Sequence, residues 1–453
     1  MTSVTAAPTD LRRELGLLDA TMINVGTMIA SAIFIVPATV AALIPGSGAM
    51  VLVWVLGGVV SLLGALSIAE LSAAYPEAGG QLPYLRAAYG PLWGFLYGWA
   101  NFLVINPAAI AAIAVGFASY LGFFVPLSAR AIQAVAIASI CGLTLLNCLA
   151  VRLGATTQNV LTFLKMIAIT VLILGAFVLP GGSSANFRPL WPGVPLRQVI
   201  GPFGLAMMSV LWAYDGWIET TFVGSEIKNP GRNLPRAIIL STFIVIAFYV
   251  SVSVAFSFVL TPLRMGASSL VASDAAQVTM GAAGAAIVAG AIMLSTLGAN
   301  NGIILTAARI PYAMARQGLF FRSQGWVHPR FATPAVALLT QGVISILLAL
   351  AGNYNQLATY VVFAQVLFYG LSATAVVKLR QSAPDLLRPY RTWGYPVTPL
   401  LFAACVVWLL ANTVVQAPRD SAVGAGLILL GLPGYWYWKK GGLPPPGTRP
   451  VAD

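Results

Sequence analysis

Charged residues are scarce in this 453-residue chain: Asp, Glu, Lys and Arg make up 8% of it, whereas hydrophobic residues make up 59%. An ordinary soluble domain carries about a quarter charged residues, so this chain has too few to cover a surface in water. The composition therefore excludes the soluble globular and disordered classes. The net charge of +12 does not indicate nucleic-acid binding, because the basic residues lie between apolar runs and form no patch interleaved with aromatic residues.

Histidine and cysteine are also rare. The chain has one histidine, His328. With so few, a metal site built from several histidines and a Ser-His triad within the membrane are both excluded. Cys141, Cys148 and Cys405 lie in apolar runs without a CxxC motif, so we interpret them as small core residues. No carboxylates, histidine or activated nucleophile cluster at one membrane depth, which disfavours an enzyme. We expect no metal and no cofactor.

Continuous apolar runs long enough to cross a bilayer recur along the chain. A helix needs about 20 mostly apolar residues to cross the hydrocarbon core. The sequence therefore predicts an all-α membrane protein with twelve transmembrane helices, at about 20–44, 49–74, 92–120, 129–149, 158–180, 201–224, 236–260, 281–308, 333–352, 355–379, 396–416 and 422–438. The turn at 352–354 is the least certain boundary, since it could belong to one long re-entrant element.

The distribution of positive charge predicts the orientation, because Lys and Arg favour cytoplasmic loops. With the N-terminus inside, 18 of the 24 Lys and Arg residues fall in cytoplasmic segments, five fall in outer segments, and Lys165 lies within a span. We therefore predict a multi-pass protein of the inner (cytoplasmic) membrane with both termini in the cytoplasm. The tails would be 1–19 and 439–453.

Three ionisable side chains lie well inside predicted spans: Lys165, Asp215 and Glu219. Charge within the hydrocarbon is costly and by default indicates a functional pathway or a buried partner. Lys165 could instead snorkel, because it follows the polar run 156–159 closely, and we expect Glu219 to face a water-filled vestibule. Three further residues lie near cytoplasmic ends and could simply reach the interface: Glu70, Glu226 and Arg309.

Small residues interrupt two spans that lie five spans apart. The first span contains the run 26–34 with Pro37 just beyond it, and the sixth contains 213–217. Transporters built from inverted repeats often unwind one helix in each repeat and bind substrate there. The same small residues could also mark nothing more than close helix packing.

Several short motifs occur in order between about residues 13 and 391. They include Ala69-Glu70-Leu71, Tyr75-Pro76-Glu77-Ala78-Gly79-Gly80, Asn106-Pro107-Ala108-Ala109, Asn147-Cys148, Gln158-Asn159, Trp212-Ala213-Tyr214-Asp215-Gly216-Trp217, Glu226-Ile227-Lys228-Asn229-Pro230, Asn233-Leu234-Pro235 and Gly298-Ala299-Asn300-Asn301-Gly302. With them the chain resembles the amino acid–polyamine–organocation (APC) superfamily. Within it, the chain is similar to the L-type amino acid transporter (LAT) family, which includes bacterial exchangers and the light chains of heteromeric amino acid transporters.

The resemblance implies a LeuT-like fold with a 5+5 inverted repeat and two appended helices. The first repeat would span 20–180, the second 201–380, and the appended helices 396–438. Free amino acids would bind between the unwound parts of helices 1 and 6, where unpaired backbone N–H groups receive a carboxylate and unpaired carbonyls receive an ammonium. The substrate-binding residues would be Thr27, Met28, Ala30, Ser31, Ala32, Trp212, Ala213, Tyr214, Asp215 and Gln365.

The roles of these residues follow from the resemblance. The carboxylate would lie against Thr27 and the backbone of 30–32, and the ammonium near the carbonyls of Met28 and of 212–214. Ala30-Ser31-Ala32 departs from the usual Gly-Ser-Gly. The added methyl groups keep the backbone donors but restrict φ and occupy space beside the substrate, which affects affinity or substrate range.

Trp212 corresponds to the aromatic gate of the family, and Gln365 to a polar position near the substrate side chain. Asp215 has two compatible interpretations. In the light chain that exchanges cystine and dibasic amino acids, an acidic residue at this place faces the cationic side chain, so Asp215 could pair with lysine or arginine. Alternatively, it caps the second half of helix 6, since Asp is favoured at N-caps.

Lys165 corresponds to a fifth-helix lysine whose ammonium lies near the sodium position of related transporters and links helices 1, 5 and 8. A permanent internal cation there would remove the need for bound sodium. If burial instead depresses its affinity for the proton, Lys165 could load and release one, which would give proton-coupled symport.

We therefore predict a sodium-independent exchanger (antiporter) of neutral, small or aliphatic L-amino acids that works by alternating access. The alternatives are a proton-coupled importer, a carrier of cationic amino acids or polyamines, and a non-transporting amino acid sensor. The expected partners are free amino acids and the lipid bilayer, with no nucleic acid. The segment 120–130 has no cysteine, so we expect no disulfide-linked heavy chain.

Overall fold

The computed structural model describes residues 11–268, 270–351, 354–416 and 418–440. Within these ranges the chain is helical apart from its loops, and the only β pairing consists of two isolated bridges, Leu15 with Ile227 and Ala78 with Val223. The expected all-α class is confirmed. Residues 352 and 353 of the uncertain turn lie outside the described ranges.

Nine helical elements lie between residues 11 and 180. They are α1 (Leu17–Met28), α2 (Ala32–Leu43), α3 (Ser47–Ala74), α4 (Leu82–Tyr89), α5 (Pro91–Ala100), η1 (Asn101–Ile105), α6 (Asn106–Leu121), α7 (Ala129–Leu149) and α8 (Val151–Val178).

The elements that follow residue 180 include several short ones at helix ends. They are η2 (Ser184–Phe187), α9 (Leu196–Ala213), α10 (Glu219–Phe222), η3 (Gly224–Glu226), α11 (Pro230–Val259), α12 (Pro262–Ala267), α13 (Val271–Ala307), α14 (Arg309–Arg316), η4 (Arg322–Gly325), α15 (Ala335–Ala351), α16 (Tyr354–Ser382), α17 (Val397–Gln416), α18 (Pro418–Leu429) and α19 (Gly431–Lys440).

By length and composition, eight helical segments of the described chain could cross a membrane, or nine if α1 and α2 form one bent span. The chain is therefore a multi-pass membrane protein. Exposed aliphatic and aromatic side chains along α7, α8, α15 and α17, such as Leu145, Phe163, Val343 and Val407, fit surfaces that face lipid. The count of twelve spans and their 5+5 repeat remain predictions.

Several predicted spans differ from the helices, and three of them differ in a way that affects their shape. The third consists of α5 and α6 joined by the π-helical turn η1, because Pro107 has no N–H with which to continue the α-helical pattern. The eighth begins ten residues early, and its helix is interrupted at Gly281, where φ is 64°. The span predicted at 422–438 covers two helices: α18 ends at Leu429 and α19 starts at Gly431, just before Pro433.

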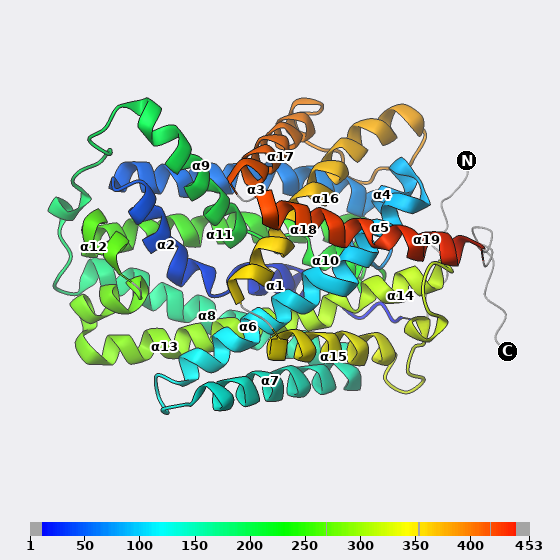
Figure 1. Ribbon diagram of the computed structural model, residues 1–453, viewed down its shortest axis with the longest axis horizontal. Helices are drawn as coiled ribbons and strands as arrows, with labels where there is room; N and C mark the ends of the chain where they lie inside the picture. Colours follow the sequence, from blue (N-terminus) through cyan, green and yellow to red (C-terminus); the bar gives the residue numbers. More distant parts are fainter. Residues whose placement is uncertain (1–10, 269, 352–353, 417, 441–453) are drawn as a thin grey trace.

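The long helices lie roughly parallel, with α3 packed along α11 and α8 packed along α13. In Figure 1, α4, α14 and α19 gather at the right-hand end of the bundle, and α12 lies at the left-hand end. The broken helices contact several of the long helices: α1 packs against α11, α8 and α13, and α9 packs against α3. Residues at both breaks, such as Met28, Ile29, Ala213 and Tyr214, are buried.

Candidate functional site

The first interruption separates α1 from α2, which are bent by 42° relative to each other. The N–H of Ala30 donates to the carbonyl of Met28 at 2.9 Å, so the helical ladder stops there. Among the described residues, no acceptor is found for the backbone N–H groups of Ser31, Ala32 and Ile33, and the Ser31 side chain does not cap the helix. The start of α2 therefore presents free donors inside the protein.

The second interruption lies between Ala213, the last residue of α9, and Glu219, the first of α10. Gly216 has φ of +110°, a conformation that residues with a Cβ rarely adopt. A Cβ at this position would also lie 3.0 Å from Thr27 Oγ1 and 3.1 Å from the backbone nitrogen of Met28. Glycine thus lets the two interruptions touch, and both predicted discontinuities are confirmed.

Polar side chains of α1 join it to the second interruption. Asn24 donates to the carbonyl of Trp217 at 2.7 Å and accepts from the N–H of Thr220 at 2.9 Å. The hydroxyl of Thr27 lies near the carbonyls of Ile23, Asn24 and Gly216. In this structure Thr27 therefore hydrogen-bonds to the protein, and it ties α1 to the segment that follows α9.

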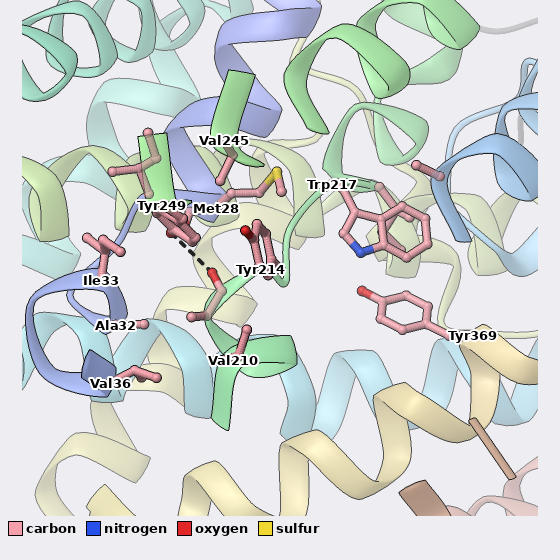
Figure 2. Close-up of a cluster of buried hydrophobic side chains, with 14 of the residues drawn as sticks. Met28, Ala32, Ile33, Val36, Val210, Tyr214, Trp217, Val245, Tyr249 and Tyr369 are labelled. Carbon is pink, nitrogen blue, oxygen red and sulfur yellow. Dashed lines mark hydrogen bonds between the residues drawn. The ribbon is translucent and has the colours of Figure 1, made fainter. Parts of the chain in front are cut away.

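Tyr249 of α11 lies between the two interruptions, as Figure 2 shows. Its hydroxyl is 2.7 Å from the carbonyl oxygen of Met28 and 3.1 Å from that of Ala213. These carbonyls are among those expected to receive an ammonium, and here a tyrosine contacts both. Sequence reasoning missed Tyr249. The one feature of the sequence that could have identified it is its position within an apolar run. A tyrosine buried there usually needs a hydrogen-bond partner for its hydroxyl.

The side chain of Lys165 is fully buried, so the snorkelling interpretation is wrong. Its ammonium donates to the carbonyls of Gly26, Ile29 and Ser295, each at 2.8 Å. The hydroxyl of Ser295 also donates to Ile29 at 2.7 Å. Lys165 therefore links α8 to the end of α1 and to α13, which lie in the spans predicted as the fifth, first and eighth.

Asp215 lies on the other side of the second interruption and faces α16. Tyr369 donates to Asp215 Oδ1 at 2.6 Å, and Gln365 donates to the same oxygen at 3.2 Å. The capping hypothesis for Asp215 is wrong, because the N-cap of α10 is Ile218 and no side chain caps it. Trp212, Asp215 and Gln365 line one cavity together with Tyr369. Tyr369 was not among the residues predicted from the sequence.

The remaining candidate residues lie at or near the two interruptions. Ser31 and Ala32 are buried at the first interruption, Ala30 is half-buried beside them, and Tyr214 is buried with its hydroxyl 3.1 Å from the carbonyl of Trp54. Glu219 is buried with the hydroxyl of Thr306 at 2.5 Å, so it contacts protein. Across the described ranges, no three His, Cys, Asp or Glu side chains are placed to hold a metal ion.

The expectation that Glu226 and Arg309 reach the interface is wrong. Both side chains are fully buried in a bidentate ion pair with distances of 2.7 and 2.9 Å. A buried charge requires such a partner, and η3 places Glu226 beside Arg309 at the start of α14.

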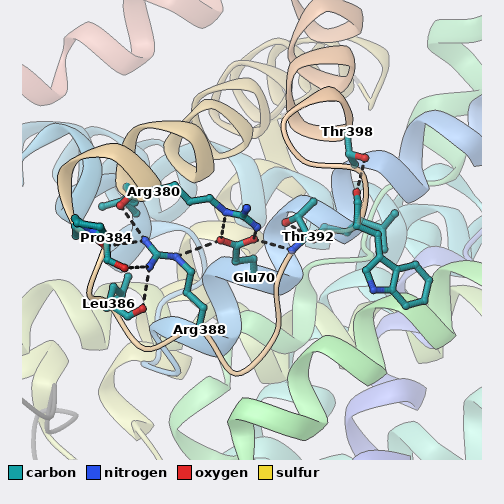
Figure 3. A network of polar contacts seen from close by, with 11 residues as sticks. Glu70, Arg380, Pro384, Leu386, Arg388, Thr392 and Thr398 are labelled. Atoms are coloured by element: carbon teal, nitrogen blue, oxygen red, sulfur yellow. Dashed lines mark hydrogen bonds and ion pairs between the residues drawn. The ribbon is translucent and has the colours of Figure 1, made fainter. Parts of the chain in front are cut away.

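Glu70 is also buried, at the end of α3 (Figure 3). It accepts from Arg380 at 2.7 and 2.9 Å, lies 3.3 Å from Arg388, and accepts from the N–H of Thr392 at 2.7 Å. Arg388 in turn donates to carbonyls at the end of α16. This network fastens α3 to α16 and to the loop before α17.

The family model described as amino acid permease matches residues 15–437 of this chain. The chain belongs to the amino acid permease family. It is 35% identical to the b(0,+)-type amino acid transporter 1 of Homo sapiens over 420 residues, which cover 90% of this chain and 84% of that protein.

Two further relatives support the same assignment within the APC superfamily. The serine/threonine exchanger SteT of Bacillus subtilis is 31% identical over 435 residues, covering 95% of this chain and 98% of that protein. The large neutral amino acids transporter small subunit 2 of Homo sapiens is 32% identical over 451 residues, covering 95% and 81%. This amino acid permease is therefore a transporter, not an enzyme, and the expected LAT-type resemblance is confirmed.

Proposed function

We propose that this permease is a sodium-independent exchanger of L-amino acids, and that the amino acid head group binds between the two interruptions. The observation that carries the proposal is the set of free N–H groups of Ser31, Ala32 and Ile33 at the start of α2. The carbonyls of Met28 and Ala213, at the ends of α1 and α9, lie close enough together to contact one hydroxyl. Backbone donors at a helix N-terminus, with the helix dipole behind them, suit a carboxylate.

The ammonium of the substrate would compete with Tyr249 for the carbonyls of Met28 and Ala213. The hydroxyl has one proton to donate, and the carbonyl of Met28 also accepts from the N–H of Ala30, so both carbonyls keep a donor when no substrate is bound. This matters because an unpaired buried carbonyl is costly. Exchange of one donor for another at this point gives a route by which substrate binding is coupled to the relative position of α1 and α9.

The arrangement of helices that we propose is the LeuT-like 5+5 repeat, with 20–180 and 201–380 as its halves and 396–438 appended. The five-span offset between the two interruptions supports it. The positive charges support cytoplasmic termini in the inner membrane. We propose that the chain works without a disulfide-linked heavy chain, as the segment 120–130 has no cysteine.

Sodium independence is supported by Lys165. Its ammonium makes three hydrogen bonds to carbonyls of Gly26, Ile29 and Ser295, and carbonyl oxygens are the ligands that a bound cation would use. In its protonated form the side chain thus supplies the positive charge that a sodium ion would otherwise bring to these carbonyls.

Neutral, small or aliphatic amino acids are the substrates that we propose first, because the methyl groups of Ala30 and Ala32 narrow the space beside the head group. A second candidate is transport of cationic amino acids. It is favoured by Asp215, a carboxylate that lines a cavity with otherwise largely apolar walls. An organic cation would satisfy this carboxylate.

The test is uptake of labelled amino acid into proteoliposomes in which internal amino acid, sodium and pH gradient are varied independently. The proposal predicts uptake only when the vesicles contain amino acid, at the same rate when choline replaces sodium. The methyl ester of the same amino acid, which lacks the carboxylate, should not compete with uptake of the labelled amino acid. Uptake driven by a pH gradient into empty vesicles would establish the proton-coupled alternative and contradict exchange.

A further inference from the structure

Glu219 is a carboxyl group in the interior that the proposed binding of the amino acid does not use. It is the first residue of α10, and its side chain is buried. The one hydrogen-bond partner found for the carboxyl among the described residues is the hydroxyl of Thr306, 2.5 Å from Oε2. In the part of the chain that the structure describes, no lysine or arginine forms an ion pair with Glu219. This carboxyl therefore has no partner of opposite charge.

Two other buried glutamates show what a charged carboxylate receives in this protein. Glu226 has the guanidinium of Arg309 on both of its oxygens. Glu70 lies against two arginines and also accepts from a backbone N–H. A buried charge is costly without partners of this kind. The surroundings of Glu219, with one hydroxyl and no cation, therefore suit a neutral carboxylic acid.

Three titratable groups lie close enough to Glu219 to interact with its charge: Asp215, Tyr97 of α5 and Tyr369 of α16. None of the three is a cation. Asp215 accepts from two side chains of α16 and from the N–H of Gly216, so its own negative charge is well supported. A negative charge on Asp215 makes a second one on Glu219 less favourable.

The helices packed against α10 are α1, α11 and α13. Their titratable side chains are occupied elsewhere or exposed. Asp19 of α1 pairs with an arginine of α8, and Asp274 of α13 accepts from a serine hydroxyl. On α11, Tyr249 contacts the carbonyls described above, and Arg232 and Arg236 are exposed. These helices therefore do not balance a charge on the first residue of α10.

The position of Thr306 also fits a protonated Glu219. The Thr306 hydroxyl lies 3.0 Å from the carbonyl of Gly302, one turn earlier in α13, as well as beside Glu219. A hydroxyl has one proton to donate, and it can also accept. If Glu219 is protonated, Thr306 donates to Gly302 and accepts from the acid, so both contacts are hydrogen bonds. The proton then fastens α10 to α13.

We propose that Glu219 is a proton-binding site of the transport cycle, which holds a proton while α10 packs on α13 and releases it when water reaches the carboxyl. On release the proton passes to that water, and the negative charge stays on Glu219. The charged form is unfavourable in this interior, so it favours conformations in which the carboxylate is hydrated. Because the cycle must return through the packed conformation, exchange slows when Glu219 stays charged. This inference rests on the proposed function, amino acid exchange.

The proton can be observed in the purified permease through the infrared C=O stretch of a protonated carboxylic acid. The spectrum of the wild type minus that of Glu219→Gln should contain this band at neutral pH, and the band should disappear as pH is raised. Glu77→Gln is the matched control, since Glu77 lies in the loop before α4 and its replacement should leave the Glu219 band in place. The band tests the site whether or not a variant transports.

The same titration should appear in the exchange of labelled amino acid by proteoliposomes held at one pH on both sides. Above the midpoint, the wild-type rate should fall about tenfold per pH unit, as for loss of one proton. Glu219→Gln cannot ionise, so its rate, relative to its own value at neutral pH, should not show this fall. Glu77→Gln should follow the wild type.

Thr306→Val keeps the shape of the side chain and removes the hydroxyl. The charged form of Glu219 loses more than the neutral form does, because hydrogen bonds to a charged group are the stronger ones. The midpoint should therefore move to higher pH by about one unit. A purely structural Thr306 would change the rate and leave the midpoint where it is.

The proposal is overturned if the difference spectrum lacks the band at neutral pH, or if Glu219→Gln shows the same alkaline fall as the wild type, which would assign the fall to another group such as Lys165. It is also overturned if wild-type exchange does not fall at any pH at which the protein stays folded, or if Thr306→Val keeps the wild-type midpoint. A wild type that exchanges no amino acid at any pH would contradict the proposed function itself, and the infrared band would still decide whether Glu219 binds a proton.

Discussion

Lys165→Met is the substitution that separates a mechanistic lysine from a structural one. Methionine fills nearly the same space and donates no hydrogen bond. The change removes three bonds of 2.8 Å, to the carbonyls of Gly26, Ile29 and Ser295. Ile29 keeps the hydroxyl of Ser295 as a donor at 2.7 Å. The carbonyl of Gly26, near the end of α1, therefore loses its donor without a replacement.

The magnitude follows from this count. A buried carbonyl left without its donor costs about 1–3 kcal/mol, which corresponds to roughly tenfold to a hundredfold in the population of the arrangement that needs it. The several kcal/mol spent on desolvating the ammonium are regained in the variant, so the fold itself should survive. We therefore expect turnover to fall by about one to two orders of magnitude while the protein remains folded.

The assay is initial exchange rate in proteoliposomes at saturating external amino acid, with sodium present or replaced by choline. Lys378→Met is the control, since Lys378 is exposed and lies over the ring of Tyr89 at 4.7 Å, far along the chain from either interruption. Wild-type turnover in Lys165→Met would refute the role of this lysine as the link between α1, α8 and α13.

Three carboxylates outside the substrate path give further predictions. Glu226→Gln leaves the fully buried Arg309 without its partner and should lower the free energy of unfolding by about 3–5 kcal/mol, read by denaturation in detergent; an unchanged midpoint contradicts this. Glu70→Gln should cost less, about 1–3 kcal/mol, because Arg380 is partly exposed and also lies over the ring of Tyr395. Burial raises the pKa of the half-buried Glu77 and outweighs the lowering effect of Arg86, so the folded state binds this proton more tightly than the unfolded state. The free energy of unfolding should therefore fall as pH rises above about 4.5. Glu77→Gln should make the free energy of unfolding less dependent on pH in this range.

The sequence could predict the features that are local in the chain. Small residues around Ser31 and Tyr214 marked both interruptions, because a helix that loses its ladder needs residues that tolerate other backbone conformations. The apolar runs gave the position of most helices. They did not give the irregular points within them, because hydropathy alone reads as continuous the π-helical turn before Pro107, the non-helical Gly281 and the break before Pro433.

Long-range pairings could not be predicted in this way. Glu70 was expected to reach the interface, and nothing in its neighbourhood reveals Arg380, which lies 310 residues away. Asp215 resembled a helix cap by its local position, but its partners Gln365 and Tyr369 come from another helix. Tyr249 lies in an apolar run and has no local feature that distinguishes it. Its contact with the carbonyls of Met28 and Ala213 is visible only in the tertiary structure.

A structure determined with an exchangeable neutral amino acid bound would test the central claim most directly. The account predicts the α-carboxylate within hydrogen-bond distance of the backbone N–H groups of Ser31, Ala32 or Ile33, and the ammonium beside the carbonyls of Met28 and Ala213. An amino acid bound elsewhere, with these N–H groups still unpaired, would contradict it.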